Sequence, residues 1–440
     1  MHLLTSSLQF TISVFGVLTA FLAPLRAEPD PFAPYLDTKA PEIVRELDST
    51  DAVPENITVR RVMFRSRDDS EIFAVIAKPK SPGKPPGILV LHGGSGSAEV
   101  DKAMAWAQRG YVAVAPDLPG IAEPTQLTGT KGKWSSLKYG EGRWVATPGG
   151  SSSVIFDSVL AAMKALYLLR SQPEVGTSRI GVVGISWGGY LATMVAGLAG
   201  DQVRAAFAVF GCGFYELTSQ LNGANPTLGK MPPDERERWL RDLDAGRLAG
   251  GIQAAFFIAG ATNDFFYWPR ALQATLDAIP GEKNHLYAPN ANHKIPLRGG
   301  TVFPKQSDKS FKPTSFQPSP TPSGSKANWM AMEVPYFDFY LKRTGKPLPK
   351  VSVCESDDPW LARYRIDATY PLTKVEVYWA KANPDVMKRE WLALPPTRSG
   401  DAYKARLPEE AADWFAVVSD DREVTVSSDL IHIKAAFFEP

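Results

Sequence analysis

The sequence contains few cysteines and histidines and carries almost no net charge. Two cysteines among 440 residues, Cys212 and Cys354, can form neither a disulfide framework nor a zinc site. We expect two unpaired thiols, with a single interdomain disulfide as the alternative. The 48 basic and 47 acidic residues leave a net charge of +1 without a basic stripe, which argues against nucleic acid as a partner. No H-E-x-x-H motif, His or Cys cluster or phosphate-binding loop is present, so we expect no metal and no organic cofactor.

Long apolar runs are also scarce, and the one that stands out lies at the start of the chain. Phe10 to Leu22 is almost entirely apolar, and Ala23 to Ala27 then ends in small residues, which is typical of a signal peptide over residues 1–27. The run is short for a membrane span. We therefore expect an exported, periplasmic or secreted protein without stable membrane insertion after cleavage. An uncleaved N-terminal anchor is the alternative, because no Lys or Arg precedes the run.

The length of the chain favours two domains, and its 44% hydrophobic and 22% charged residues are typical of a globular protein. Apolar strand patterns alternate with helical ones over residues 28–343, which predicts an α/β domain with a mostly parallel sheet and helices on both faces. A proline-containing linker follows at 344–350. Residues 351–440 show short β-rich runs without helical periodicity, which predicts a small all-β, sandwich-like domain.

The central motif of the α/β domain is Gly184-Ile-Ser-Trp-Gly188, which fits the G-x-S-x-G nucleophile elbow. An apolar strand, Ile180 to Val183, precedes it, and a helical pattern follows from Tyr190. This context favours Ser186 as a nucleophile over a serine in an ordinary tight turn. Cys212 lies outside any such motif, so we expect it to be a buried structural residue.

A second glycine-rich stretch follows the apolar strand that ends at His92. Backbone N–H groups of Gly93 or Gly94, together with that of Trp187 directly after the nucleophile, predict an oxyanion hole. We expect His92 itself to hold the loop.

Elimination among the five histidines identifies the general base. One lies in the signal peptide, one precedes the nucleophile and two belong to strand patterns: His2, His92, His285 and His432. His293 remains, in a loop just past a strand, where α/β-hydrolases carry their histidine. Asp264 ends an apolar strand and is the predicted orienting acid, whereas its rivals Asp242 and Asp244 lie in or beside a charged helical run.

Aromatic residues surround these positions in the sequence. Trp187, Tyr267, Trp268 and Trp144 are candidate substrate contacts. We expect Phe265 and Phe266 to pack in the core. Residues 118–153 form a long irregular stretch that could act as a lid.

Several of these motifs together resemble a known group of proteins. They are His92-Gly-Gly, Arg109 to Asp117, Leu168 to Ser171, Gly184 to Tyr190, Gly211 to Phe214 and Asn263-Asp-Phe. The chain between residues 57 and 343 resembles secreted bacterial α/β-hydrolases grouped with acetyl xylan esterases, dienelactone hydrolases and prolyl oligopeptidase catalytic domains. Dienelactone hydrolases proper have cysteine where this chain has Ser186, and the sequence leaves no room for the propeller of prolyl oligopeptidases.

The resemblance implies a serine hydrolase that cleaves carboxylic esters through an acyl-enzyme, with small-molecule or oligosaccharide acetyl esters as candidate substrates. Two alternatives remain open. One is a peptidase or amidase with the same triad. The other is a non-catalytic carbohydrate-binding protein, in which the C-terminal domain would bind through Trp360, Trp379 or Trp391. We expect those tryptophans to form that domain's core.

Overall fold

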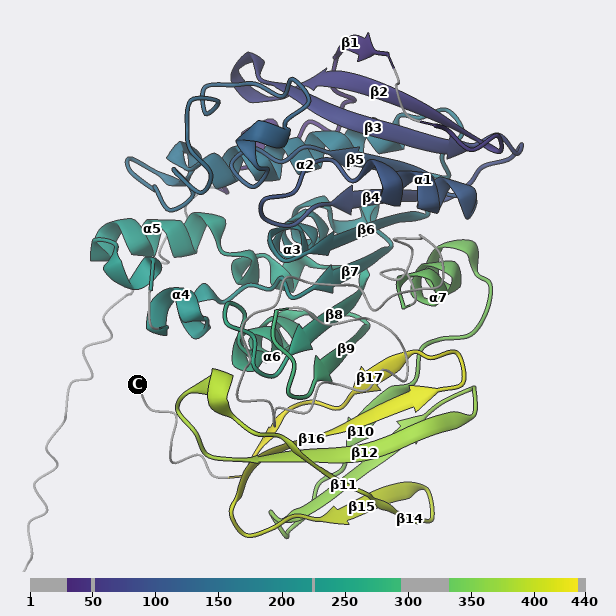
Figure 1. The fold of residues 1–440 in the computed structure, drawn as a ribbon, viewed down its shortest axis with the longest axis vertical. Helices are drawn as coiled ribbons and strands as arrows, with labels where there is room; N and C mark the ends of the chain where they lie inside the picture. Colours follow the sequence, from purple (N-terminus) through teal and green to yellow (C-terminus); the bar gives the residue numbers. More distant parts are fainter. Residues whose placement is uncertain (1–29, 49–51, 224–225, 294–331, 434–440) are drawn as a thin grey trace, which may run out of the picture.

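The computed structural model describes residues 30–48, 52–223, 226–293 and 332–433. The predicted signal peptide and the Pro- and Ser-rich stretch at 299–327 lie outside these residues. A large mixed sheet occupies the N-terminal part, and two antiparallel sheets follow it in the C-terminal part (Figure 1). This arrangement confirms the predicted fold class.

The large sheet has nine strands in the order β1-β2-β3-β5-β4-β6-β7-β8-β9. Their bounds are β1 Ile43–Leu47, β2 Ile57–Arg65, β3 Glu71–Pro79, β4 Gly87–Leu91, β5 Val112–Pro116, β6 Ile180–Ile185, β7 Ala205–Val209, β8 Ala255–Ala261 and β9 Lys283–Ala288. Strands β1, β2, β3 and β5 pair antiparallel, and all pairs from β5 through β9 are parallel. The central parallel strands are apolar along their whole length because both of their faces are buried.

Helices cover both faces of this sheet. The covering helices are α1 Val100–Gln108, α2 Val154–Arg170, α3 Trp187–Ala199, α6 Pro269–Ala278 and α7 Glu333–Phe337, which continues as a π-helical turn over Asp338–Lys342. Two further helices, α4 Ser219–Asn222 and α5 Pro233–Leu243, pack on short 3-10 turns beside the sheet (Figure 1). In β6, Ile180 shares its face with Leu169 of α2, whereas the next residue, Gly181, faces Phe337 of α7. Since successive strand residues point to opposite faces, α2 and α7 lie on opposite sides of the sheet.

Helix α2 differs from the amphipathic helix that its sequence indicates. Its residues are buried almost all around, because the segment before β1 covers the side turned away from the sheet. Phe32 stacks on Phe156 with ring centroids 4.5 Å apart, and Tyr35 contacts the same ring edge-on. The N-terminal segment therefore completes the core of the α/β domain.

The C-terminal β domain consists of two antiparallel sheets, β10-β11-β15-β14 and β13-β12-β16-β17, with β18 paired to β16. The bounds are β10 Lys350–Val353, β11 Leu361–Asp367, β12 Leu372–Lys381, β13 Leu392–Leu394, β14 Thr397–Ser399, β15 Ala402–Arg406, β16 Ala411–Asp420, β17 Thr425–Ser427 and β18 Ile431–His432. Every residue of β16 is buried. Trp379 and Trp391 are buried, as expected of core residues, and Trp360 is partly buried.

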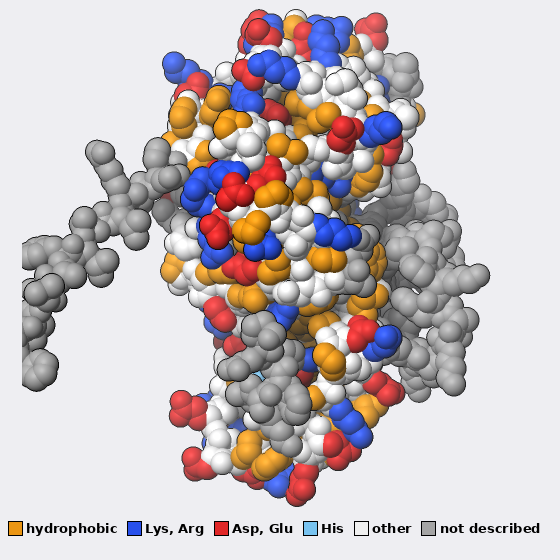
Figure 2. All heavy atoms as spheres, turned by 90° about the vertical axis from the view of Figure 1, so that its left-hand side faces the viewer, with side chains coloured by type: hydrophobic (Ala, Val, Ile, Leu, Met, Phe, Trp, Pro, Cys, Tyr) orange, Lys and Arg blue, Asp and Glu red, His pale blue; other side chains and the backbone are white. Residues whose placement is uncertain are grey.

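Both cysteines are free, Cys212 fully buried and Cys354 partly exposed, as the sequence predicts. Burial raises the pKa of the Cys212 thiol well above its ordinary value, which makes it a poor nucleophile. Within the described ranges, no helix has the length and hydropathy needed to cross a membrane. Figure 2 shows acidic and basic side chains interspersed over one face of the molecule, in line with the small net charge.

Candidate active site

Ser186 stands at the sharp turn between β6 and α3. Its backbone has φ +56° and ψ −118°, a conformation that residues other than glycine rarely adopt. A Cβ atom at Gly184 would lie 2.0 Å from the Gly188 carbonyl oxygen, and one at Gly188 would lie 2.1 Å from the Leu91 carbonyl oxygen. Only glycine fits at either position, which is the physical reason for the spacing of the motif.

The structure brings Ser186, His293 and Asp264 together in one hydrogen-bonded chain. The His293 Nε2 atom lies 2.8 Å from Ser186 Oγ, and its Nδ1 atom lies 2.8 Å from Asp264 Oδ2. The other carboxylate oxygen of Asp264 accepts hydrogen bonds from the N–H groups of Phe266 at 2.6 Å and Tyr267 at 3.0 Å. These donors fix the orientation of the fully buried carboxylate.

Asp242 and Asp244, the other two candidates for the orienting acid, bind backbone groups elsewhere in the fold. Asp244 accepts hydrogen bonds from the backbone N–H groups of Phe214, Tyr215 and Gly246, and burial raises its pKa to about 6. Asp242 accepts one from the N–H of Gly150. Their contacts explain both residues as structural.

The other described histidines also have structural partners. His92 accepts a hydrogen bond through Nε2 from the N–H of Leu118, and burial lowers its pKa to about 4. His285 bonds to the Ser428 carbonyl oxygen, and His432 lies against Asp413. His92 thus holds the glycine-rich loop, as expected from the sequence.

The predicted oxyanion donors lie beside the nucleophile. A Cβ atom at Gly93 would lie 3.5 Å from Ser186 Cβ, and one at Gly94 would lie 3.0 Å from Cδ1 of Trp187. Trp187 is the first residue of α3, so its N–H has no partner within the helix. The hydroxyl of Tyr139 lies over the same loop, at 2.6 Å from the Gly94 Cβ position.

A small pocket of about 40 Å³ opens at Ser186. It is lined by Ser186, Trp187, Tyr215, Gln220, Phe266 and Tyr267. Two of the predicted substrate contacts, Trp187 and Tyr267, therefore lie in it. Tyr215 also belongs to this wall, and its hydroxyl lies 2.9 Å from that of Tyr267.

The expectation that Phe266 packs in the core is wrong. Phe266 is 39% exposed, because it lies past the end of β8, in a short turn that two backbone hydrogen bonds to Asp264 hold beside the pocket. The rings of Phe266 and His293 meet edge-on, with centroids 5.1 Å apart. Phe265 is partly buried and also contacts His293.

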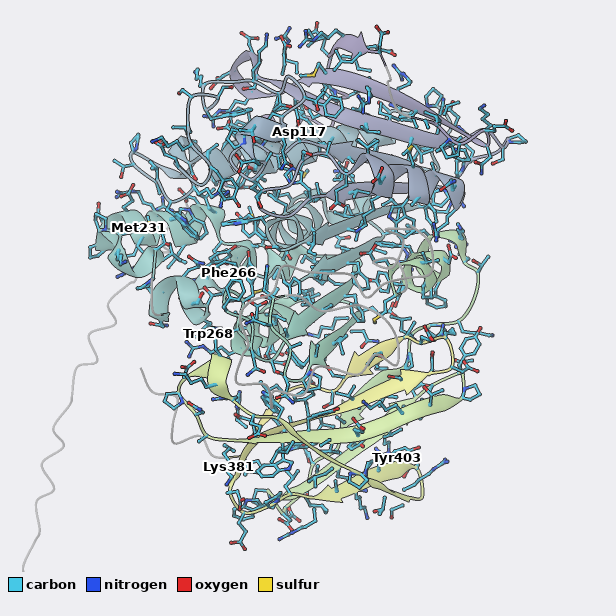
Figure 3. The ribbon with its side chains drawn as sticks, viewed as in Figure 1. Asp117, Met231, Phe266, Trp268, Lys381 and Tyr403 are labelled. Carbon is cyan, nitrogen blue, oxygen red and sulfur yellow. The ribbon has the colours of Figure 1, made fainter. Side chains whose placement is uncertain are left out.

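The remaining two aromatic candidates lie elsewhere. Trp144 contacts Trp187 at 5.7 Å between ring centroids and Trp239 at 4.8 Å, which places it behind the pocket wall. Trp268 lines a separate cavity of about 370 Å³ with Val386, Arg389 and Trp391 of the C-terminal domain. Figure 3 shows Phe266 and Trp268 on the same loop, with Trp268 nearer to the C-terminal sheets.

Residues 118–153, the predicted lid, run as an irregular segment with short 3-10 turns beside the pocket. Arg143 from this segment stacks on Tyr139 and Trp187, with its guanidinium carbon 4.2 and 5.3 Å from the two ring centroids. The segment therefore packs against Trp187, which itself lines the pocket. In the part of the chain that the structure describes, no cluster of three metal-ligating side chains occurs.

Residues 72–232 match the model of the family described as "Dienelactone hydrolase family". The match includes the glycine-rich loop at Gly93–Gly94 and the turn with Ser186, and it ends before Asp264. Over these residues the chain is therefore similar to the dienelactone hydrolase family, which agrees with the resemblance seen in the sequence.

Several solved structures are similar to this chain, and one of them supports the fold. An acetyl xylan esterase from Paenibacillus sp. R4 matches with a TM-score of 0.51 and 22% identity over 60% of this chain and 87% of that chain. Acetyl xylan esterase 1 from Thermoanaerobacterium sp. JW/SL YS485 matches with a TM-score of 0.49 and 21% identity, over 60% of this chain and 87% of that chain. An acylaminoacyl peptidase from Pyrococcus horikoshii matches with a TM-score of 0.46 and 18% identity, over 67% of this chain and 43% of that chain. At these identities the first similarity establishes the α/β-hydrolase fold and leaves the substrate open.

Proposed function

We propose that this protein is a serine hydrolase that cleaves carboxylic esters with short acyl groups, acetyl esters of sugars being the candidate natural substrates. The observation that carries the proposal is the continuous hydrogen-bonded chain from Asp264 through His293 to Ser186, at 2.8 Å for each link. This is the geometry that acyl transfer by an activated serine requires.

The roles of the three side chains follow from their contacts. His293 accepts the proton of Ser186 Oγ as that oxygen attacks the ester carbonyl carbon, and Asp264 holds the imidazole in the tautomer that can do so. The negative charge formed on the carbonyl oxygen is stabilised by the N–H of Trp187 and by an N–H of the Gly93–Gly94 loop. His293 then donates its proton to the departing alcohol, which leaves an acyl group on Ser186.

Water completes the cycle by the same route in reverse. His293 takes a proton from the water molecule as its oxygen attacks the acyl carbon, and returns that proton to Ser186 Oγ when the carboxylic acid leaves. The imidazole of His293 thus accepts and then donates one proton in each half of the reaction.

The size of the pocket supports a short acyl group. At about 40 Å³, with Tyr215, Phe266 and Tyr267 around it, it has room for only a few heavy atoms, since one water needs on the order of 10–15 Å³. An acetyl methyl group fits this space, whereas a longer chain would have to displace the aromatic walls.

Hydrolysis of p-nitrophenyl acetate, butyrate and hexanoate tests the proposal. We expect kcat/KM to fall with each lengthening of the acyl chain and turnover to disappear in Ser186→Ala. Ser171→Ala, which changes a serine at the end of α2 that bonds to the Leu168 carbonyl, serves as the control and should keep full activity. Cleavage of aminoacyl p-nitroanilides without ester turnover would favour the peptidase alternative. Failure of both reactions, with binding of oligosaccharide, would favour the non-catalytic one.

We further propose that residues 1–27 direct export. Expression of the full chain in a bacterial host should then yield a periplasmic or secreted protein that begins at Glu28. An intact N-terminus in the membrane fraction would support the uncleaved anchor instead.

A further inference from the structure

We propose that the C-terminal β domain is part of the catalytic apparatus, because its segment Val386–Trp391 holds in place both loops that carry the triad's acid and base. Asn263 and Asn290 are the positioning residues that make these contacts. The inference rests on the proposed function, since it assigns a role in the same reaction.

The first contact is made by the residue directly before Asp264. Asn263 is 4% exposed, and its side-chain Nδ2 lies within 3.2 Å of the carbonyl oxygens of Val386 and Met387 and 2.7 Å from that of Arg389. An amide group can donate to such a cluster of acceptors, whereas a side chain without N–H groups would leave them unsatisfied.

The second contact is made in the loop that leads to His293. Asn290 donates from Nδ2 to the Trp391 carbonyl at 2.8 Å, and its Oδ1 accepts from the Trp391 N–H at 2.8 Å. The side chain thus pairs with the backbone of Trp391 as a neighbouring strand would. This reciprocal pair fixes the loop three residues before the predicted base.

Thr262 connects the two contacts. Its hydroxyl donates to Asn263 Oδ1 at 2.8 Å and accepts from the Asn290 N–H at 2.8 Å. One backbone hydrogen bond, from the Asn263 N–H to the Ala291 carbonyl oxygen at 3.0 Å, adds to this link. The acid loop, the base loop and the C-terminal segment therefore form one hydrogen-bonded unit behind the triad.

The C-terminal segment is itself held firmly. Arg389 forms an ion pair with Asp413 of β16, and their side chains are 5% and 1% exposed. The Arg389 Nε atom also donates to the Asn383 carbonyl at 2.9 Å. Burial of the pair makes its separation costly, so the carbonyl oxygens that face Asn263 keep their position.

Isosteric substitutions separate this positioning role from general loss of structure. Asn263→Asp and Asn290→Asp keep the side-chain shape but replace each N–H donor with a carboxylate oxygen. Asn284→Asp is the matched control, because Asn284 also donates to a backbone carbonyl outside the α/β domain, that of Pro349 in the linker at 2.8 Å, but lies at the start of β9 and outside the catalytic loops. Asn263→Ala covers the case in which the buried aspartate prevents folding.

The readout is the split between kcat and KM for p-nitrophenyl acetate, with thermal unfolding followed in parallel. We expect the Asn263 and Asn290 variants that fold to lose about 10- to 100-fold in kcat with little change in KM, since displaced catalytic groups affect the chemical step. Asn284→Asp should stay within about twofold of the parent. Equal kcat in all folded variants, or an equal loss in the control, would overturn the inference.

A second measurement excludes an indirect effect. If Asn263 acts through Asp264, then Asn263→Ala should add little to the loss already caused by Asp264→Asn, measured as the rate at which a fluorophosphonate labels Ser186. Additive losses would show that Asn263 acts by another route. A parent protein that the fluorophosphonate does not label would contradict the proposed function itself. A labelled parent whose Asn263 variants react at the same rate would contradict only this inference.

Discussion

The ring of Phe266 stands edge-on to the imidazole of His293, with centroids 5.1 Å apart and planes at 89°. The same ring lines the pocket at Ser186. Phe266 therefore bounds this pocket on the side of the predicted base, and under the proposed function its ring should limit the length of the acyl group.

Phe266→Ala should enlarge the acyl pocket and shift selectivity toward longer esters. Each methylene accommodated in an apolar pocket is worth about 1–3 kcal/mol, so the ratio of kcat/KM for butyrate over acetate should rise by roughly tenfold or more. Parallel kinetics with the two p-nitrophenyl esters measure this ratio.

Trp268→Phe is the matched control for that substitution, because Trp268 lies on the same loop but lines the cavity next to the C-terminal domain. Its selectivity should equal that of the parent protein. An unchanged ratio in Phe266→Ala, or an equal change in Trp268→Phe, would show that the acyl group lies elsewhere.

The two buried aspartates should respond differently to substitution by asparagine. Asp264→Asn removes the carboxylate that fixes the His293 tautomer and should lower kcat by roughly 10³- to 10⁴-fold. Asp244→Asn weakens the hydrogen bonds to three backbone N–H groups. It should reduce the free energy of unfolding by about 1–3 kcal/mol and leave kcat of the folded protein nearly unchanged.

Ester kinetics and urea unfolding of both variants test this distinction. A variant of Asp244 that folds normally but loses kcat as severely as Asp264→Asn would contradict the assignment of the acid.

The buried imidazole of His92 should make the free energy of unfolding depend on pH. Burial lowers its pKa from 6.5 to about 4, so between these values the unfolded chain binds a proton that the folded chain rejects. The contribution of His92 to stability is therefore fully present above pH 6.5 and is lost as the pH falls toward 4. The difference amounts to about 3 kcal/mol.

The measurement is urea unfolding at several pH values between 7 and 4, for the parent and for His92→Gln. Glutamine offers a side-chain oxygen to the Leu118 N–H without titrating in this range. The parent should lose about 3 kcal/mol more than the variant over the interval. Parallel losses in the two proteins would mean that His92 takes up its proton without disturbing the fold.

The sharp turn at Ser186 and the proximity of Ser186, Asp264 and His293 could be predicted from the sequence because their signals are local. Gly184 and Gly188 are required by contacts within a few residues and with the neighbouring strand, so the motif itself carries the geometry. Asp264 and His293 each follow a strand that the sequence predicts, and parallel strands bring their carboxyl ends to one edge of the sheet.

Other features depend on contacts between distant segments and left no local signal. Asn263 donates hydrogen bonds to residues more than 120 positions further along the chain, and the sequence around Asn263 gives no indication of these acceptors. Helix α2 is enclosed because Phe32 comes from far upstream. Tyr215 follows the Gly211 to Phe214 motif closely enough to have been a candidate, whereas Gln220 had no comparable signal.

The labelling of Ser186 by a fluorophosphonate tests the central claim most directly, because the reagent reports on an activated serine without any assumption about the substrate. Peptide mapping after the reaction should find one modified residue per chain, at Ser186, and none in Ser186→Ala. His293→Ala should slow the reaction by at least about 100-fold, since the serine then lacks its base. Absence of labelling in the parent protein, or modification of a different residue, would contradict a Ser186–His293–Asp264 catalytic site.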